Sequence, residues 1–238
     1  MDASVLLKPV AEAAERFAAS VESLSDVQAR EDSLVPPWTR GHVATHVARA
    51  TDSLCRLLDS ARTGVETPQY PSMAARAAEI EDGAGRPVTV LAADVRATSA
   101  RFEAAVRALP PTAWNAQVRM RTGELRTPAS LVATRLRELE VHHADLAAGY
   151  TFADVPSETA RWIIDDLVKA LARRTPVPAV HVEATDTDLT HRLGAGAPTV
   201  RGPQPALLAW LTGRSTGTDL RATTPAGPMP VPPAPHWI

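Results

Sequence analysis

Apolar side chains recur every three or four residues along the first segment of the chain. In residues 4–24 they occupy Val5, Leu6, Val10, Ala13, Ala14, Phe17, Val21 and Leu24. Charged residues fall on the opposite face, which is typical of an amphipathic helix. The spacing returns in residues 39–62, after the break at Pro36 and Pro37. Thr39 suits the N-cap of this second helix, because its hydroxyl can accept a hydrogen bond from a free backbone N–H.

Further helices are predicted before residue 150. Residues 72–81 suit a short helix, and the mixed stretch 112–126 suits a short extended segment near residues 117–120. An Ala-rich helix starts at Pro87, because proline fits the first turn of a helix, and it stops before Pro110. Another starts at Thr127. The principal helices predict a four-helix bundle, and they cover residues 4–24, 39–62, 87–109 and 127–148.

The pattern changes after residue 155. Residues 157–173 again have helical spacing, whereas residues 179–184 and 189–193 are predicted as strands. Residues 205–212 predict a short helix that ends at Gly213. We therefore expect an α+β protein, with a four-helix bundle over residues 1–150 and a small α/β domain over residues 155–238.

The tail from Pro225 onward is rich in proline. Proline removes a backbone donor and fixes φ, so this tail cannot be helical and is at best an edge strand or an extended segment.

Composition narrows the class of protein. The formal net charge is −2 and 45% of residues are hydrophobic, with no long basic run, so neither nucleic acid nor an anionic membrane is favoured. Charges spread through residues 1–24 exclude the apolar core of a signal peptide, and no apolar stretch suits a membrane span. The single cysteine, Cys55, permits a reducing compartment. We expect a cytoplasmic monomer.

Two pairs of side chains could carry chemistry. His42 and His46 are four residues apart on one predicted helix, and Glu138 and His142 are four apart on another. Each pair therefore shares a helix face. Bundles build metal sites from inward-facing side chains on different helices. Two neutral imidazoles and one carboxylate suit zinc with an open position, and equally suit non-haem Fe(II).

Each pair also has a plainer interpretation. A zinc-protease motif needs a glutamate directly after the first histidine, where this chain has Val43. Glu138 and His142 could form a surface contact contributing only about 0.2–0.5 kcal/mol. Trp38 suits a core or helix-start contact as well as a pocket wall. Arg135 and Arg137 are interpreted as solvated.

Longer stretches resemble a known family. Residues 38–49 (WTRGHVATHVAR) and 135–146 (RLRELEVHHADL) resemble two helices of the mycothiol-dependent maleylpyruvate isomerase family, which belongs to the DinB-like metal-binding bundles. Residues 200–202 (VRG) and 207–214 (LLAWLTGR) resemble that family's C-terminal domain, which is similar to sterol-carrier folds. The resemblance covers nearly the whole chain.

The resemblance implies a divalent metal, zinc by preference, with His46, Glu138 and His142 as its ligands. His42 and His143 match neighbouring positions that are not ligands.

Two more residues receive expected roles. Asp145 could orient an imidazole, or could instead cap the helix or form an ion pair. Arg214 resembles the arginine that the family's C-terminal domain directs towards the active site, although a structural role fits it almost as well.

The thiol is expected to come from outside the protein. Cys55 lies nine residues after His46, which turns it about 180° away on an α-helix. The resemblance implies mycothiol, and the Ala-, Arg- and Pro-rich composition suits an actinobacterial source. The implied reaction is cis–trans isomerisation, in which a thiolate adds to the double bond of a maleyl substrate and is then eliminated. Arg214 is the expected cation beside the developing enolate.

Two other functions stay open from the sequence. One is a zinc-dependent mycothiol S-transferase that conjugates electrophiles. The other is a non-catalytic ligand-binding module with a structural metal. Three protein ligands argue against the module, because structural zinc sites usually have four, and His42 as a fourth ligand would favour it.

Overall fold

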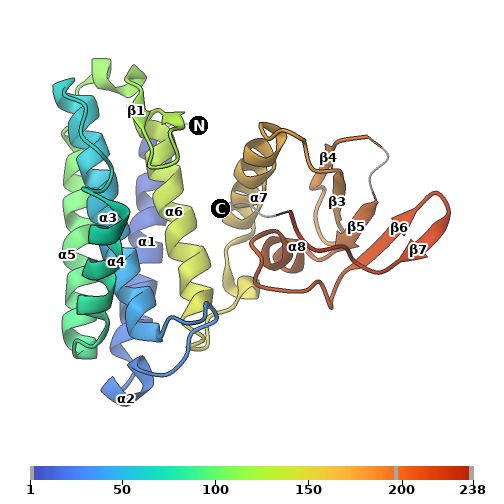
Figure 1. Ribbon diagram of the computed structural model, residues 1–238, viewed down its shortest axis with the longest axis horizontal. Coiled ribbons are helices and arrows are strands. Elements are labelled where there is room, and N and C mark those ends of the chain that lie inside the picture. The colour runs from blue at the N-terminus through green and yellow to red at the C-terminus, as the bar shows by residue number, and fades with distance from the viewer. Residues whose placement is uncertain (1–2, 196–197, 236–238) are drawn as a thin grey trace. The chain divides into compact units, whose positions relative to one another are not determined.

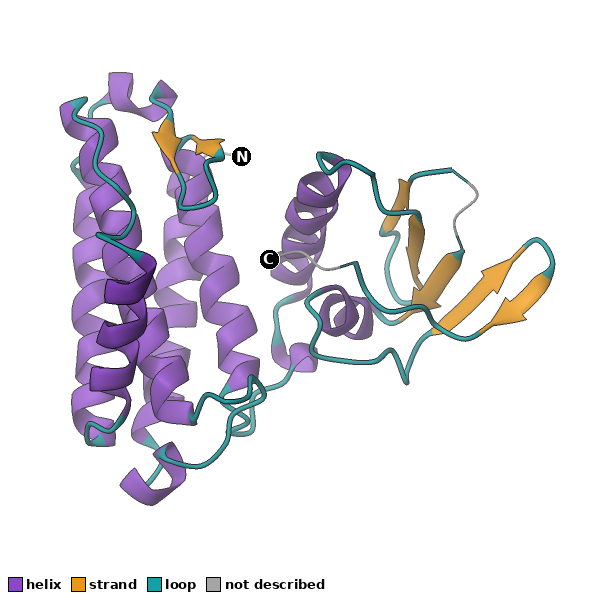
Figure 2. Cartoon of the chain, in the orientation of Figure 1, coloured by secondary structure: helices purple, strands orange, loops and turns teal. Residues whose placement is uncertain are grey.

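The computed structural model describes residues 3–195 and 198–235. The chain divides into two compact units, Met1–Tyr150 and Thr151–Ile238 (Figure 1). The first is helical and the second combines helices with a sheet (Figure 2). This composition confirms the expected α+β class.

Four long helices form the first unit. Helix α1 packs against α5 and α6, and α3 packs against the same two helices, which closes the bundle. The predicted four-helix bundle is therefore confirmed, and its helices are α1 (Ala3–Glu22), α3 (Arg40–Thr63), α5 (Val88–Arg107) and α6 (Pro128–Asp145).

Local chemistry fixes the ends of these helices. Thr39 caps α3 by accepting from the backbone N–H of His42, while the His42 ring accepts from the Thr39 N–H. Gly64 ends α3 at a φ of 74°, a left-handed conformation that glycine adopts without a steric penalty. Helix α6 begins at Pro128, whose missing N–H costs nothing at the first helical position. These caps define the helices that carry the candidate ligands.

Two short helices accompany the bundle. Helix α2 (Asp26–Ala29) follows α1, and α4 (Met73–Ala84) packs against α3. The contact between α3 and α4 needs glycine, because a Cβ at Gly41 would lie 2.1 Å from the Ala84 carbonyl oxygen. A Cβ at Gly83 would lie 2.4 Å from Cγ2 of Thr45. Helix α4 therefore lies closer to α3 than larger residues would allow.

The segment between α5 and α6 contains a 3₁₀ turn, η1 (Pro111–Asn115), and a small hairpin. Strand β1 (Val118–Arg119) pairs antiparallel with β2 (Leu125–Arg126). The extended piece expected near residues 117–120 is therefore one side of this hairpin.

The bundle core is mostly apolar, with two buried arginine side chains. Its fully buried side chains include Phe17, Leu54, Leu57, Phe102, Leu131, Leu136 and Leu139. Arg135 is 0% exposed and Arg137 is 8% exposed, so the prediction that both are solvated was wrong. Arg135 precedes Glu138 by three residues and shares its inward face. Its Nη1 donates to the Val47 carbonyl at 3.3 Å and its Nη2 to Ser99 Oγ at 3.0 Å.

The second unit is built around a five-stranded sheet in the order β4-β3-β5-β6-β7. Strand β3 pairs parallel with β5, and the other pairs are antiparallel. The strands are β3 (Val180–Ala184), β4 (Thr190–Leu193), β5 (Thr199–Gly202), β6 (Arg221–Thr224) and β7 (Gly227–Met229). The first two were predicted, and β5 and β6 were not. Strand β7 places part of the proline-rich tail at the edge of the sheet.

Helices complete the second unit. The turn η2 (Phe152–Asp154) leads into α7 (Ser157–Ala172), which packs against α8 (Gln204–Leu211) and β4. Helix α8 packs against β3 and β5. Trp210 of α8 is fully buried, and its indole N–H donates to the Pro232 carbonyl at 3.0 Å. This bond ties the proline-rich tail to the helix.

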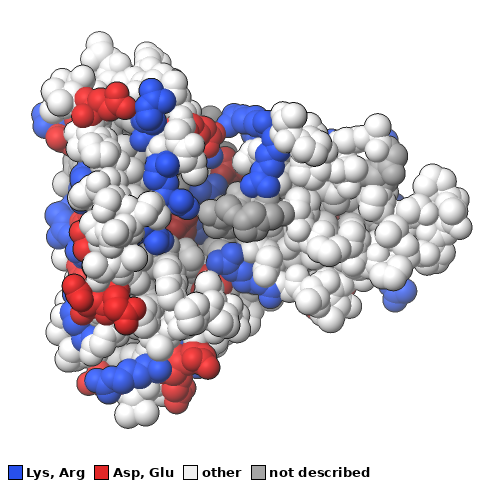
Figure 3. Space-filling model, viewed as in Figure 1, with Lys and Arg blue, Asp and Glu red and all other residues white. Residues whose placement is uncertain are grey.

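Charges of both signs are interspersed over the face of the bundle in Figure 3. Many form ion pairs, such as Arg49 with Asp94 at 2.7 Å and Arg96 with Glu15 at 2.9 Å. Across the part of the chain that the structure describes, no helix has both the length and the apolar character needed to cross a membrane.

Candidate metal centre

Helices α3 and α6 bring three donor atoms together inside the bundle. Nε2 of His46 lies 3.1 Å from Nε2 of His142. Oε2 of Glu138 lies 3.4 Å from the first nitrogen and 3.5 Å from the second. The residues that the sequence selected therefore converge on one point, although His46 is distant from the other two along the chain.

The spacing of these atoms fits a divalent metal. Two ligands at about 2.0–2.1 Å from zinc and at the tetrahedral angle are roughly 3.3 Å apart. The three observed separations, 3.1, 3.4 and 3.5 Å, lie on both sides of that value. Two imidazole nitrogens with one carboxylate oxygen also form a donor set that zinc binds in catalytic sites.

The site is enclosed but not sealed. The side chains of His46, His142 and Glu138 are 7%, 12% and 20% exposed, respectively. Three protein ligands at a partly accessible point would leave a bound ion room for a further ligand from solution.

Asp145 fixes the orientation of one imidazole. Its Oδ2 lies 2.8 Å from Nδ1 of His142, and its side chain is fully buried. Because an ionised carboxylate only accepts hydrogen bonds, Nδ1 of His142 donates this one. Nε2 of His142 therefore points towards Glu138 and His46.

Burial and hydrogen bonds shift the pKa values of all three candidate ligands. Burial lowers the pKa of His46 to about 4, so this ring is neutral at neutral pH. Burial opposes ionisation of Glu138, but hydrogen bonds with His142 and His46 hold its pKa well below the usual value. Burial also opposes charge on His142, yet hydrogen bonds with Asp145 and Glu138 raise its pKa to about 9. In the metal-free protein, Glu138 then accepts from both Nε2–H groups.

Aromatic and cationic side chains surround His46. The ring of Trp38 lies 5.1 Å from the His46 ring between centroids, which makes Trp38 a wall of the site. Nη2 of Arg76, on α4, lies 3.2 Å from Nδ1 of His46. No sequence spacing indicated Arg76, because its position depends on how α4 packs on α3.

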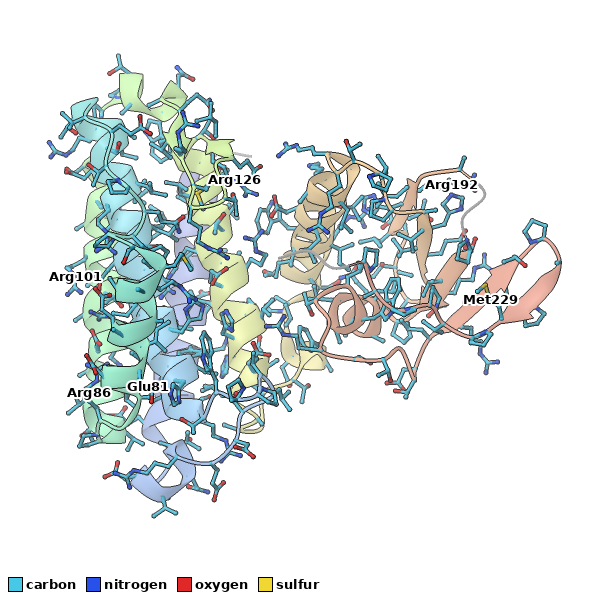
Figure 4. All side chains as sticks on the ribbon, viewed as in Figure 1. Glu81, Arg86, Arg101, Arg126, Arg192 and Met229 are labelled. Carbon is cyan, nitrogen blue, oxygen red and sulfur yellow. The ribbon has the colours of Figure 1, made fainter. Side chains whose placement is uncertain are left out.

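The neighbouring histidines lie outside the donor cluster. Nδ1 of His42 accepts from the Thr39 N–H at 3.2 Å, and its Nε2 lies 3.1 Å from Glu81, which Figure 4 labels on α4. His143 stacks on Tyr150 with ring centroids 3.7 Å apart. His42 is therefore not a fourth ligand, which removes the argument for a structural metal.

The sequence also gave expectations for Arg214, as a cation near the substrate, and for Cys55, as a thiol outside the site. Arg214 lies in the second unit, where its Nη1 donates to the Thr212 carbonyl at 2.6 Å. Cys55 lies on α3 and is half-buried, and burial raises the pKa of its thiol to about 11. Cys55 is not among the atoms that converge with His46, Glu138 and His142.

The fold and the site define a class of protein, a four-helix bundle with a candidate metal centre that is followed by an α/β unit. Profiles of two protein domains match the chain. The mycothiol maleylpyruvate isomerase N-terminal domain matches residues 10–147, and the C-terminal domain of the same family matches residues 138–234. The chain belongs to the mycothiol maleylpyruvate isomerase family.

Solved structures support the same fold. The chain is similar to the crystal structure of a mycothiol-dependent maleylpyruvate isomerase, with a TM-score of 0.88 and 24% identity over 100% of this chain and 98% of the other. A histidine-to-alanine mutant of such an enzyme gives a TM-score of 0.87 at 24% identity, with the same coverage. No curated protein of matching sequence was found.

Proposed function

We propose that this chain is a metal-dependent isomerase that uses mycothiol to convert the cis double bond of a maleyl substrate, maleylpyruvate in the first instance, into the trans form. The observation that carries the proposal is the convergence of Nε2 of His46, Nε2 of His142 and Oε2 of Glu138. Family membership supplies the reaction type and the thiol.

His46, Glu138 and His142 would hold the metal, and zinc is the ion we propose because the donor set matches its catalytic sites. When bound, a divalent zinc ion supplies a Lewis acid that keeps a thiol deprotonated at neutral pH. The protein's part is to aim both imidazoles at one point, and His142 gives up its Nε2 proton when the metal binds. The Asp145 carboxylate orients His142 by holding the other proton on Nδ1.

Two further residues of the chain have proposed roles. We propose Asp145 as a positioning residue, because it acts through His142. We propose Arg214 as the cation that stabilises negative charge on the substrate as its double bond is lost and regained. The net reaction adds and removes no atoms, so the enzyme must deliver the thiol and recover it in each turnover.

The proposed thiol is external because the protein's own thiol is unsuited to the task. Cys55 is absent from the donor cluster, and its raised pKa leaves little thiolate at neutral pH. We further propose that the protein acts as a monomer in the cytoplasm. Size-exclusion chromatography with light scattering tests the monomer.

The direct test is an isomerase assay with the metal-loaded protein and maleylpyruvate. We expect conversion to the trans isomer with mycothiol and almost none without it. Equal conversion without thiol would contradict the proposal. Conjugation of electrophiles by mycothiol without isomerisation would also contradict it and would identify an S-transferase.

A further inference from the structure

Arg76 is held beside the metal centre by aromatic rings. Its guanidinium carbon lies 5.9 Å from the ring centroid of Trp38 and 5.7 Å from that of Tyr70. Nη2 is directed at Nδ1 of His46, at 3.2 Å. Cation–π contacts of this kind hold a guanidinium in place without neutralising its charge.

The guanidinium lacks an acidic partner among the described residues. Two other arginines of the bundle have one, because Arg86 and Arg49 both pair with Asp94, at 2.9 and 2.7 Å. Arg76 makes no ion pair within the described parts of the chain, and its Nε is buried without a hydrogen-bond partner. A buried donor without an acceptor is costly, so a charged, partly buried guanidinium in this state is suited to receive an anion.

The contact with His46 is incompatible with metal binding by the same ring. A guanidinium has no acceptor, so Nδ1 of His46 presents its lone pair to Arg76 and the ring proton lies on Nε2. A neutral imidazole that binds a metal through Nε2 carries its proton on Nδ1 instead. Metal binding therefore requires Arg76 to turn its N–H groups away from His46, while its charge stays unchanged.

The charges near the centre favour an anion at this point. The carboxylates of Glu138 and Asp145 would balance the charge of a divalent ion bound by two neutral imidazoles. Arg76 then leaves the centre with one net positive charge. We propose that Arg76, once released from His46 by the metal, binds a carboxylate group of the substrate at the metal centre. This inference rests on the proposed function, since it assigns the carboxylate-binding residue for a maleyl substrate.

The test measures two affinities that should move in opposite directions. Zinc affinity is measured on metal-depleted protein by competition with a chelator. Binding of succinate, a saturated dicarboxylate that cannot undergo addition, is measured on zinc-loaded protein by calorimetry without thiol. For Arg76→Gln we expect zinc to bind about 10-fold more tightly, because the competing donor is gone. We expect succinate to bind at least about 10-fold more weakly.

Arg56→Gln is the matched control, since Arg56 also lies over the Tyr70 ring, at 5.9 Å, and is not among the groups that contact His46. It should change neither the zinc affinity nor the succinate affinity.

Two further readouts separate anchoring from a structural role. Arg76→Lys should recover part of the succinate binding that Arg76→Gln loses. In Arg76→Gln, the KM for substrate should rise more than kcat falls.

Either of two results would overturn the inference. Weaker binding of both zinc and succinate in Arg76→Gln would mean a structural role, and unchanged succinate binding would mean that Arg76 anchors no carboxylate. Failure of the proposed function is a separate result, because succinate binding through Arg76 can be present in a protein that does not isomerise maleylpyruvate.

Discussion

Nδ1 of His142 donates a hydrogen bond to Oδ2 of Asp145 across 2.8 Å, and the accepting carboxylate is completely buried. The two residues are three apart on α6, so one helical turn supplies both the candidate ligand and the group that orients it. The sequence allowed Asp145 to orient an imidazole, to cap the helix or to form an ion pair. The geometry directs its carboxylate at the imidazole of His142.

Replacing Asp145 with alanine should weaken zinc binding by about 10- to 100-fold, because His142 loses the partner that fixes its tautomer. Chelator competition on metal-depleted protein measures the change. Asp59→Asn is a suitable control, since Asp59 forms an exposed ion pair with Arg62. Equal zinc affinity in Asp145→Ala and the parent would show that the carboxylate does not support the metal centre.

Zinc affinity should depend steeply on pH. In the metal-free protein the pKa of His142 is raised to about 9 and that of His46 is lowered to about 4, so only His142 must lose a proton to bind zinc. The proton is bound below pH 9, and affinity should therefore rise about 10-fold per pH unit from pH 6 to pH 8. Chelator competition at three pH values tests this. A flat profile above pH 6.5 would mean that the pKa of His142 is not raised.

Cys55 should be an unreactive thiol that catalysis does not need. Burial raises its pKa to about 11 from 9.0, so at pH 8 its thiolate fraction is about 100-fold lower than that of an unperturbed thiol. Alkylation by iodoacetamide, followed by mass spectrometry, should be slow in the native protein and fast in urea. Cys55→Ala should retain its metal and its mycothiol-dependent activity. Loss of activity in this variant would mean that Cys55, and not an external thiol, is the nucleophile.

Gly41→Ala should destabilise the bundle, because the new Cβ would lie 2.1 Å from the Ala84 carbonyl oxygen and α4 would have to move. We expect a loss of about 1–3 kcal/mol in the free energy of unfolding, measured by urea denaturation. Gly85→Ala is the control, because no atom lies within 4 Å of a Cβ built there and φ is −84°. Equal stability of the two variants would contradict the close packing of α4 on α3.

The bundle could be predicted from the sequence because its helices carry long periodic patterns and clear caps, such as Thr39 and Pro128. Strands β5 (Thr199–Gly202) and β6 (Arg221–Thr224) were missed because each is four residues long and contains only one apolar side chain, Val200 and Ala222 respectively. Such short runs show too little alternation to be separated from loops. Their pairing partners are set by tertiary structure.

The candidate ligands were predictable for a different reason. The four-residue spacing of Glu138 and His142 fixes a shared helix face, and the family resemblance selected His46 to meet it. The same spacing argument would have placed Arg135 inside, since it shares the face of Glu138. Arg76 could not have been found in this way, because it reaches His46 from α4, whose position depends on close packing at Gly41 and Gly83.

The measurement that tests the central claim most directly is the zinc content per chain of the purified parent, His46→Ala and His42→Ala. His42 serves as the matched histidine, because it lies on the same helix and contacts Thr39 and Glu81 instead of the donor cluster. We expect about one zinc per chain in the parent and in His42→Ala, and almost none in His46→Ala. Equal zinc in all three proteins, or none in the parent even after zinc is added, would contradict a metal centre at His46, Glu138 and His142.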